Sequence, residues 1–128
     1  SILFLCLGNI CRSPLAEGAA RAAFADAAIW AELDSAGTGD WHIGRAPDRR
    51  AQAIAKEHGV DIGGLAARQI DHEDFERFDL ILAADHENLA DLKAMAPQNS
   101  RAKLALMMDM VPGRTGEAVA DPYYGDAD

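Results

Sequence analysis

The sequence is short of the features that mark several protein classes. It has two cysteines in 128 residues, too few for a disulfide-stapled scaffold. It has no apolar run near the roughly 18–20 residues that span a bilayer, and its longest apolar stretches, 2–7 and 80–84, are the size of strands. Its 12 basic residues face 21 acidic ones, and this net charge of −9 argues against a nucleic-acid partner. These shortages exclude a membrane protein, a small secreted knot and a basic binding module.

The start of the chain lacks the pattern of a targeting signal. Residues 1–7 are apolar, but no basic region precedes them and the stretch is shorter than a signal peptide needs. A lipoprotein signal would require a small residue where Leu5 precedes Cys6. We therefore expect a cytoplasmic protein without a membrane partner.

The order of apolar segments predicts the fold. An apolar strand at 2–6 is followed by an alanine-rich helical segment, and strands and helices then alternate with no linker or low-complexity segment. Such alternation is typical of an α/β domain with a parallel sheet. We expect one domain over residues 1–128, with a doubly wound four-stranded parallel sheet flanked by helices. The expected strands are 2–6, 29–33, 79–83 and 104–108. The expected helices are 14–28 (capped by Ser13), one that opens at Pro47 and Asp48 and closes at His58, and two with Asp71 and Asp85 as N-caps.

The residues with chemical potential gather between the first strand and the first helix. Cys6 ends the strand, Gly8 and Asn9 break the apolar run, and Ser13 and Pro14 indicate a helix start. The carboxyl end of a parallel strand that leads into a helix is a common place for anions to bind. The backbone N–H groups of so short a loop can surround an anion. The sequence therefore predicts a phosphate-binding loop here.

Cys6 and Arg12 have the spacing needed to act on one bound group. Five residues separate them, so one turn of chain brings the sulfur and the guanidinium to the same anion from different sides. A thiol is a nucleophile as its thiolate, which a helix N-terminus and Arg12 would stabilise. Arg12 can then bind phosphoryl oxygens in a bidentate manner, and the Ser13 hydroxyl can donate to the sulfur. The alternatives are a buried structural thiol and a surface arginine.

Three separated motifs resemble those of the low-molecular-weight protein tyrosine phosphatase family. Residues 6–14 (CLGNICRSP) resemble its signature loop, residues 34–38 and 40–44 its variable substrate loop, and residues 121–125 (DPYYG) its late acid loop. The motifs occur in order over nearly the whole chain. The resemblance implies hydrolysis of phosphotyrosine and aryl phosphomonoesters through a cysteinyl-phosphate, with no metal and no cofactor.

The resemblance also implies a role for each site residue. Cys6 is the nucleophile, Arg12 binds phosphate and stabilises the transition state, and Asp121 is the general acid and then the general base. From the residues alone, Asp121 has the alternative role of a turn residue before a proline. The residues expected to bind the phosphate are Leu7, Gly8, Asn9, Ile10, Cys11 and Ser13.

Aromatic residues make up only 6% of the chain, so their clustering is informative. By resemblance, Trp41, Tyr123 and Tyr124 surround the mouth of the cleft, where they would favour phosphotyrosine over phosphoserine; the alternative is ordinary surface or core aromatics. The implied partner is a phosphotyrosine-containing protein, a tyrosine kinase among the candidates, or a small aryl phosphate. We expect a monomer or weak dimer and no nucleic-acid partner.

Cys11 has two possible roles. In the family this neighbour can bond reversibly to the nucleophile and protect it from over-oxidation, and the alternative is a small core residue. The sequence also departs from the family, because Leu65 stands where several relatives have a loop-supporting histidine. By comparison with the family we also expect the C-terminal helix of relatives to be missing after Asp128.

The sequence leaves other functional interpretations open. Arsenate reductase shares the fold and loop but needs additional cysteines to relay a disulfide. A phosphoarginine phosphatase of the same family tends to have threonine where this chain has Ile10. A non-enzymatic anion-binding module would have no use for a nucleophile and an acid. The histidines show no metal-ligand spacing, and Arg49 and Arg50 are interpreted as a solvated helix face.

Overall fold

The computed structural model describes residues 1–110, 113, 116 and 117. Its centre is a four-stranded parallel sheet with strand order β2-β1-β3-β4. Helices flank this sheet, so the predicted α/β fold class is confirmed. The strands are β1 (Ile2–Cys6), β2 (Leu33–Gly37), β3 (Leu80–Ala83) and β4 (Lys103–Leu106).

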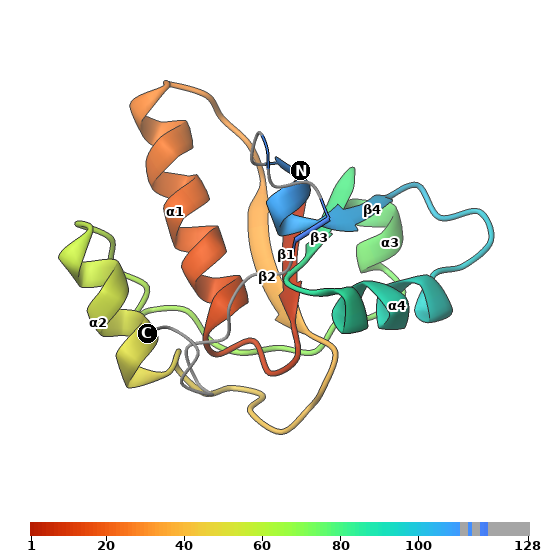
Figure 1. The fold of residues 1–128 in the computed structure, drawn as a ribbon, viewed down its shortest axis with the longest axis horizontal. Coiled ribbons are helices and arrows are strands. Elements are labelled where there is room, and N and C mark those ends of the chain that lie inside the picture. The colour runs from red at the N-terminus through yellow and green to blue at the C-terminus, as the bar shows by residue number, and fades with distance from the viewer. Residues whose placement is uncertain (111–112, 114–115, 118–128) are drawn as a thin grey trace.

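The helices are divided between the two faces of the sheet. Figure 1 shows α1 and α2 on one side of the strands, and α3 and α4 on the other. Within the described ranges, no helix combines the length and the apolar character that a membrane span requires. The helices are α1 (Arg12–Asp26), α2 (Arg49–Glu57), α3 (Asp74–Arg77), α4 (His86–Met95) and the 3₁₀ helix η1 (Met107–Met110).

Alternation along β1 sends Cys6 to a particular face. Leu3 and Leu5 belong to the core cluster that contains Phe75 of α3 and Leu92 of α4. Phe4 and Cys6 belong to the opposite cluster, against which α1 packs. Since successive side chains of a strand point to opposite faces, the last residue of β1 presents its sulfur on the side where α1 begins.

Two strands lie elsewhere than predicted. The second strand is Leu33–Gly37 and not 29–33, because Leu33 pairs with Ile2 while Ile29 and Trp30 lie outside the sheet and are 56% and 89% exposed. The last strand ends at Leu106, not at Met108, because the chain turns there into η1. In both cases the apolar run includes residues that do not pair with a neighbouring strand.

The helix starts were predicted with mixed success. Asp85 is an N-cap as expected and accepts a hydrogen bond from Asn88 N at 2.8 Å. Asp48, expected at the opening of its helix, is also an N-cap and accepts from Arg50 N at 2.9 Å. Asp71 lies before its helix, which starts at Asp74.

The prediction for α1 is wrong at both ends. The helix starts at Arg12, with Cys11 at the N-cap position and no side-chain cap, and it ends at Asp26. Ser13 therefore lies inside the first turn and is not the cap. Its hydroxyl is used in the site described next.

Candidate active site

The Cys6 sulfur lies at the end of β1, buried at 3% exposure beneath the turn that leads into α1. Asn9 adopts a left-handed backbone, with φ of +58°, a conformation that asparagine tolerates better than most residues. This turn directs the Asn9 N–H at Cys6 Sγ, with a distance of 3.2 Å. The loop conformation thus places a backbone donor on the sulfur.

A chain of hydrogen bonds orients a second donor toward the sulfur. The Arg68 N–H donates to Asn9 Oδ1 at 2.9 Å, so Asn9 Nδ2 faces the other way and donates to Ser13 Oγ at 2.8 Å. Ser13 Oγ lies 3.0 Å from Cys6 Sγ. Because Oγ already accepts from Asn9, its own hydrogen is available to the sulfur. Both donors stabilise negative charge on Cys6.

The loop lies directly on the end of β2. A Cβ at Gly37 would come within 2.7 Å of the Leu7 carbonyl oxygen and 3.2 Å of Asn9 N. The absence of a side chain permits this approach. The next residues of this segment add two hydrogen bonds, Thr38 N to the Cys6 carbonyl at 3.0 Å and Gly39 N to the Leu7 carbonyl at 2.9 Å.

Leu65 has no polar side chain with which to support the catalytic loop, and Arg68 provides this support instead. Its guanidinium makes two hydrogen bonds to Asp74, at 2.9 and 3.0 Å, and one to Asp34 of β2 at 3.2 Å. Burial opposes the charge, but these hydrogen bonds and the two carboxylates raise the pKa of Arg68 above its ordinary value. Leu65 instead packs beside an apolar cluster of α2.

Arg12 is held by an acidic residue from the other half of the sheet. Its Nη1 donates to Asp85 Oδ2 at 2.9 Å, and its side chain is 9% exposed. Asp85 Oδ1 meanwhile caps α4 through Asn88 N. One carboxylate therefore joins the start of α4 to the arginine that follows the loop. From the sequence, Asp85 is predicted only as a helix cap.

A second contact at the start of α4 reaches the segment after β4. His86 Nε2 lies 2.7 Å from the Gly116 carbonyl oxygen. The Gly116 N–H donates to Asp109 Oδ1 at 2.7 Å, and Leu106 N donates to Asp109 Oδ2 at 3.0 Å. These contacts hold Gly116, which lies five residues before Asp121 in the sequence.

The Asp109 carboxylate gives this attachment a defined response to acid. Backbone hydrogen bonds from Gly116 and Leu106 lower the pKa of Asp109 below its ordinary value of 3.8. A lowered folded-state pKa contributes stability above the ordinary value, and this contribution is lost as the pH falls through the folded-state value.

We expect the Gly116 amide to exchange hydrogen faster in Asp109→Ala than in the wild type near neutral pH. Amide exchange followed by NMR measures this, and equal protection in both proteins would contradict it.

Some of the remaining predicted site residues lie in the part of the chain that the structure describes, and others lie outside it. Trp41 is 65% exposed and its ring lies against Gly39, while the His42 ring lies against Gly8 of the loop. Cys11 is buried, and both cysteines are thiols. Three predicted residues lie outside the described part of the chain: Asp121, Tyr123 and Tyr124.

The geometry suits a nucleophilic reaction on an anion. A buried sulfur with two donors lies at the start of α1, whose N-terminus attracts negative charge, and an ion-paired arginine follows in the same segment. Across the residues with assigned positions, no group of three histidine, cysteine or acidic side chains is placed to hold a metal ion.

Comparisons with known proteins agree with this geometry. The family model described as low molecular weight phosphotyrosine protein phosphatase matches residues 1–128. A Schizosaccharomyces pombe protein named low molecular weight phosphotyrosine protein phosphatase is 42% identical, over 99% of this chain and 81% of its own.

Solved structures give the same result. The crystal structure of Primo-1 has a TM-score of 0.91 and 38% identity, covering 97% of this chain and 81% of its own. That of DARP, described as drosophila arginine phosphatase, has a TM-score of 0.90 and 32% identity, covering 98% and 82%. This chain therefore belongs to the low molecular weight phosphotyrosine protein phosphatase family.

Proposed function

We propose that this chain hydrolyses phosphotyrosine and other aryl phosphomonoesters without a metal ion or other cofactor. The observation that supports this most directly is the hydrogen-bond chain from Arg68 through Asn9 and Ser13 to the Cys6 sulfur. It prepares the sulfur to act as an anion, and an anion-binding module has no need for that. Arg12 lies in the same segment, with one nitrogen held by Asp85.

The proposed reaction has two displacements at phosphorus. In the first, the Cys6 thiolate forms the S–P bond while the bond to the tyrosine oxygen breaks, and Asp121 gives that oxygen its proton. In the second, Asp121 takes a proton from water, the water oxygen attacks phosphorus and the S–P bond breaks. Phosphate leaves and the thiolate is restored. Ser13 favours this last departure because its hydroxyl stabilises the sulfur anion.

Phosphate oxygens would be bound by the N–H groups of residues 7–13 and by Arg12. Their contacts tighten as charge redistributes in the transition state. Trp41, Tyr123 and Tyr124 would enclose the phenyl ring, and Ile10 would add an apolar wall. This arrangement would favour a long aryl phosphate over phosphoserine.

The proposed substrate is a phosphotyrosine-containing protein, a tyrosine kinase among the candidates, or a small aryl phosphate, acted on by a monomer or weak dimer. We place this activity in the cytoplasm, where thiols such as Cys6 and Cys11 stay reduced. Under peroxide these two thiols would form a disulfide while the peroxide is reduced to two water molecules. Dithiothreitol would then restore activity.

The role of Asp121 gives the test of the proposal. Asp121→Asn should slow phosphotyrosine turnover by about 10²–10⁴-fold, because the phenolate would leave without a proton. The loss should be smaller for p-nitrophenyl phosphate, whose leaving group is stable as an anion. Steady-state kcat on both substrates measures this difference. An unchanged rate on phosphotyrosine would assign the acid to another residue.

Phosphoarginine is the second candidate substrate, favoured by the likeness to DARP, described as drosophila arginine phosphatase. Ile10 favours the aryl substrate instead. Phosphotyrosine and phosphoarginine peptides of matched sequence separate the two, and a higher kcat/KM for phosphoarginine would replace the proposal.

A further inference from the structure

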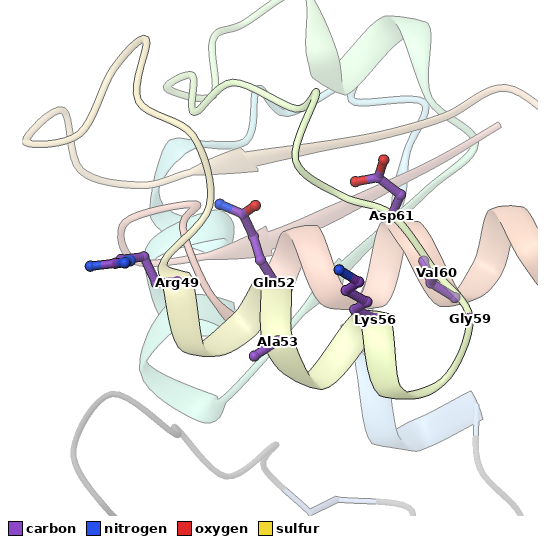
Figure 2. A pocket seen from close by; sticks show the side chains of 7 residues that line it. All are labelled: Arg49, Gln52, Ala53, Lys56, Gly59, Val60 and Asp61. Atoms are coloured by element: carbon purple, nitrogen blue, oxygen red, sulfur yellow. The ribbon is translucent and has the colours of Figure 1, made fainter.

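A cleft outside the catalytic loop lies between α2 and the segment that follows it. Its volume is about 680 Å³, and it is lined by Arg49, Gln52 and Lys56 of α2 and by Val60 and Asp61 beyond it. Figure 2 shows Arg49 at one end of this cleft, Asp61 at the other, and Lys56 between them. The side chains come from one face of the helix, at spacings of three, four and seven residues.

This cleft starts next to the catalytic loop. Asp48, the cap of α2, donates its backbone N–H to the Ile10 carbonyl oxygen at 2.7 Å. Arg49 is the next residue, so the first cation of the cleft lies one position from a residue bonded to the loop. A substrate held at Cys6 would thus have the cleft within reach of its neighbouring residues.

The two basic side chains that line the cleft form no ion pair within the part of the chain that the structure describes. Arg49 and Lys56 make no ion pair to any described residue, and neither does Arg45 in the loop before α2. The Asp61 carboxylate at the far end already accepts a hydrogen bond from Gly63 N at 2.9 Å. The cleft therefore presents two exposed cations that are free to bind an anion.

The charge near the cleft differs in sign from the net charge of the chain. The chain carries −9 overall, whereas residues 45–61, which include the whole cleft, hold four basic and three acidic residues. An acidic segment would be repelled by most of the surface and attracted to this part. Arg49, which the sequence predicts to lie on a solvated helix face, therefore belongs to a region that attracts acidic segments.

We propose that this cleft binds acidic residues that flank the phosphotyrosine of a protein substrate, an inference that rests on the proposed function. Arg49 and Lys56 are two helical turns apart, about 10 Å along the axis. Side chains two positions apart in an extended peptide point the same way and lie about 7 Å apart, a separation that the long Arg49 and Lys56 side chains can accommodate. The substrate would carry two carboxylates two positions apart, either before or after its phosphotyrosine.

The test compares four substrates: p-nitrophenyl phosphate, a neutral phosphotyrosine peptide, and two peptides with paired acidic residues placed before or after the phosphotyrosine. The wild type should prefer one acidic peptide to the neutral one by about three- to tenfold in kcat/KM, the factor that two exposed ion pairs supply. This preference should shrink at 0.5 M salt, which screens exposed charges.

The double variant Arg49→Glu, Lys56→Glu should lose the preference and keep its rate on p-nitrophenyl phosphate. The double variant Lys93→Glu, Lys103→Glu on α4 and β4 is the control matched in charge, since both lysines are exposed and outside the cleft, and it should keep the preference. A wild type without any acidic preference, or a preference that persists in the Arg49→Glu, Lys56→Glu variant, would overturn the inference. A wild type that hydrolyses none of the four substrates would instead refute the proposed function.

Discussion

Replacing Cys6 by serine should abolish phosphatase activity, with a loss of at least about 10⁴-fold in kcat for p-nitrophenyl phosphate. The hydroxyl has nearly the size of the thiol and can accept the same hydrogen bonds from Asn9 and Ser13. It does not ionise near neutral pH, however, so the donors would have no anion to stabilise. The measurement is single-turnover and steady-state release of p-nitrophenolate.

The control for this variant is its ability to bind the anion. Cys6→Ser keeps the loop and Arg12, so it should still bind inorganic phosphate, as isothermal titration can measure, and should retain the far-ultraviolet circular dichroism of the wild type. Substantial turnover by a folded Cys6→Ser protein would refute covalent catalysis by Cys6.

The second large effect is expected for Arg12. Arg12→Lys keeps the charge but loses the planar pair of donors that a phosphoryl group accepts from. We expect kcat/KM to fall by about 10²–10³-fold, the range for losing a preorganised donor to transition-state charge. Steady-state kinetics with p-nitrophenyl phosphate measures this loss.

Asp85→Asn separates the donor itself from its positioning. Asparagine keeps an oxygen for the cap of α4 but removes the charge that holds Arg12 Nη1. Its effect should be smaller than that of Arg12→Lys. Equal losses in the two variants would mean that the ion pair, and not the guanidinium fork, is what the reaction needs.

The sequence predicts the part of the site that is local in the chain. Cys6, Asn9 and Ser13 lie within eight residues, and their residue types predict a strand end at Cys6, a break at Asn9 and a helix start close to Ser13. The error at Ser13 has a physical reason. The same hydroxyl can cap a helix or serve the sulfur, and only the folded loop determines which.

The supporting residues could not be predicted because their roles come from tertiary contacts. Arg68 reaches Asn9 across 59 positions, and Asp85 reaches Arg12 across 73. One signal was available for Asp85. It follows the predicted strand 79–83, and the carboxyl ends of parallel strands share one edge of the sheet.

The contact of Gly37 with the loop has a consequence for how this protein tolerates variation. A methyl group there would press on the Leu7 carbonyl, which belongs to the residue after the nucleophile. We expect this contact to misalign the Cys6 sulfur more than it disturbs the apolar core, to which Gly37 contributes little. We expect alanine at this position to lower turnover more than stability, so an assay of turnover would detect the change more sharply than a screen for solubility or melting temperature.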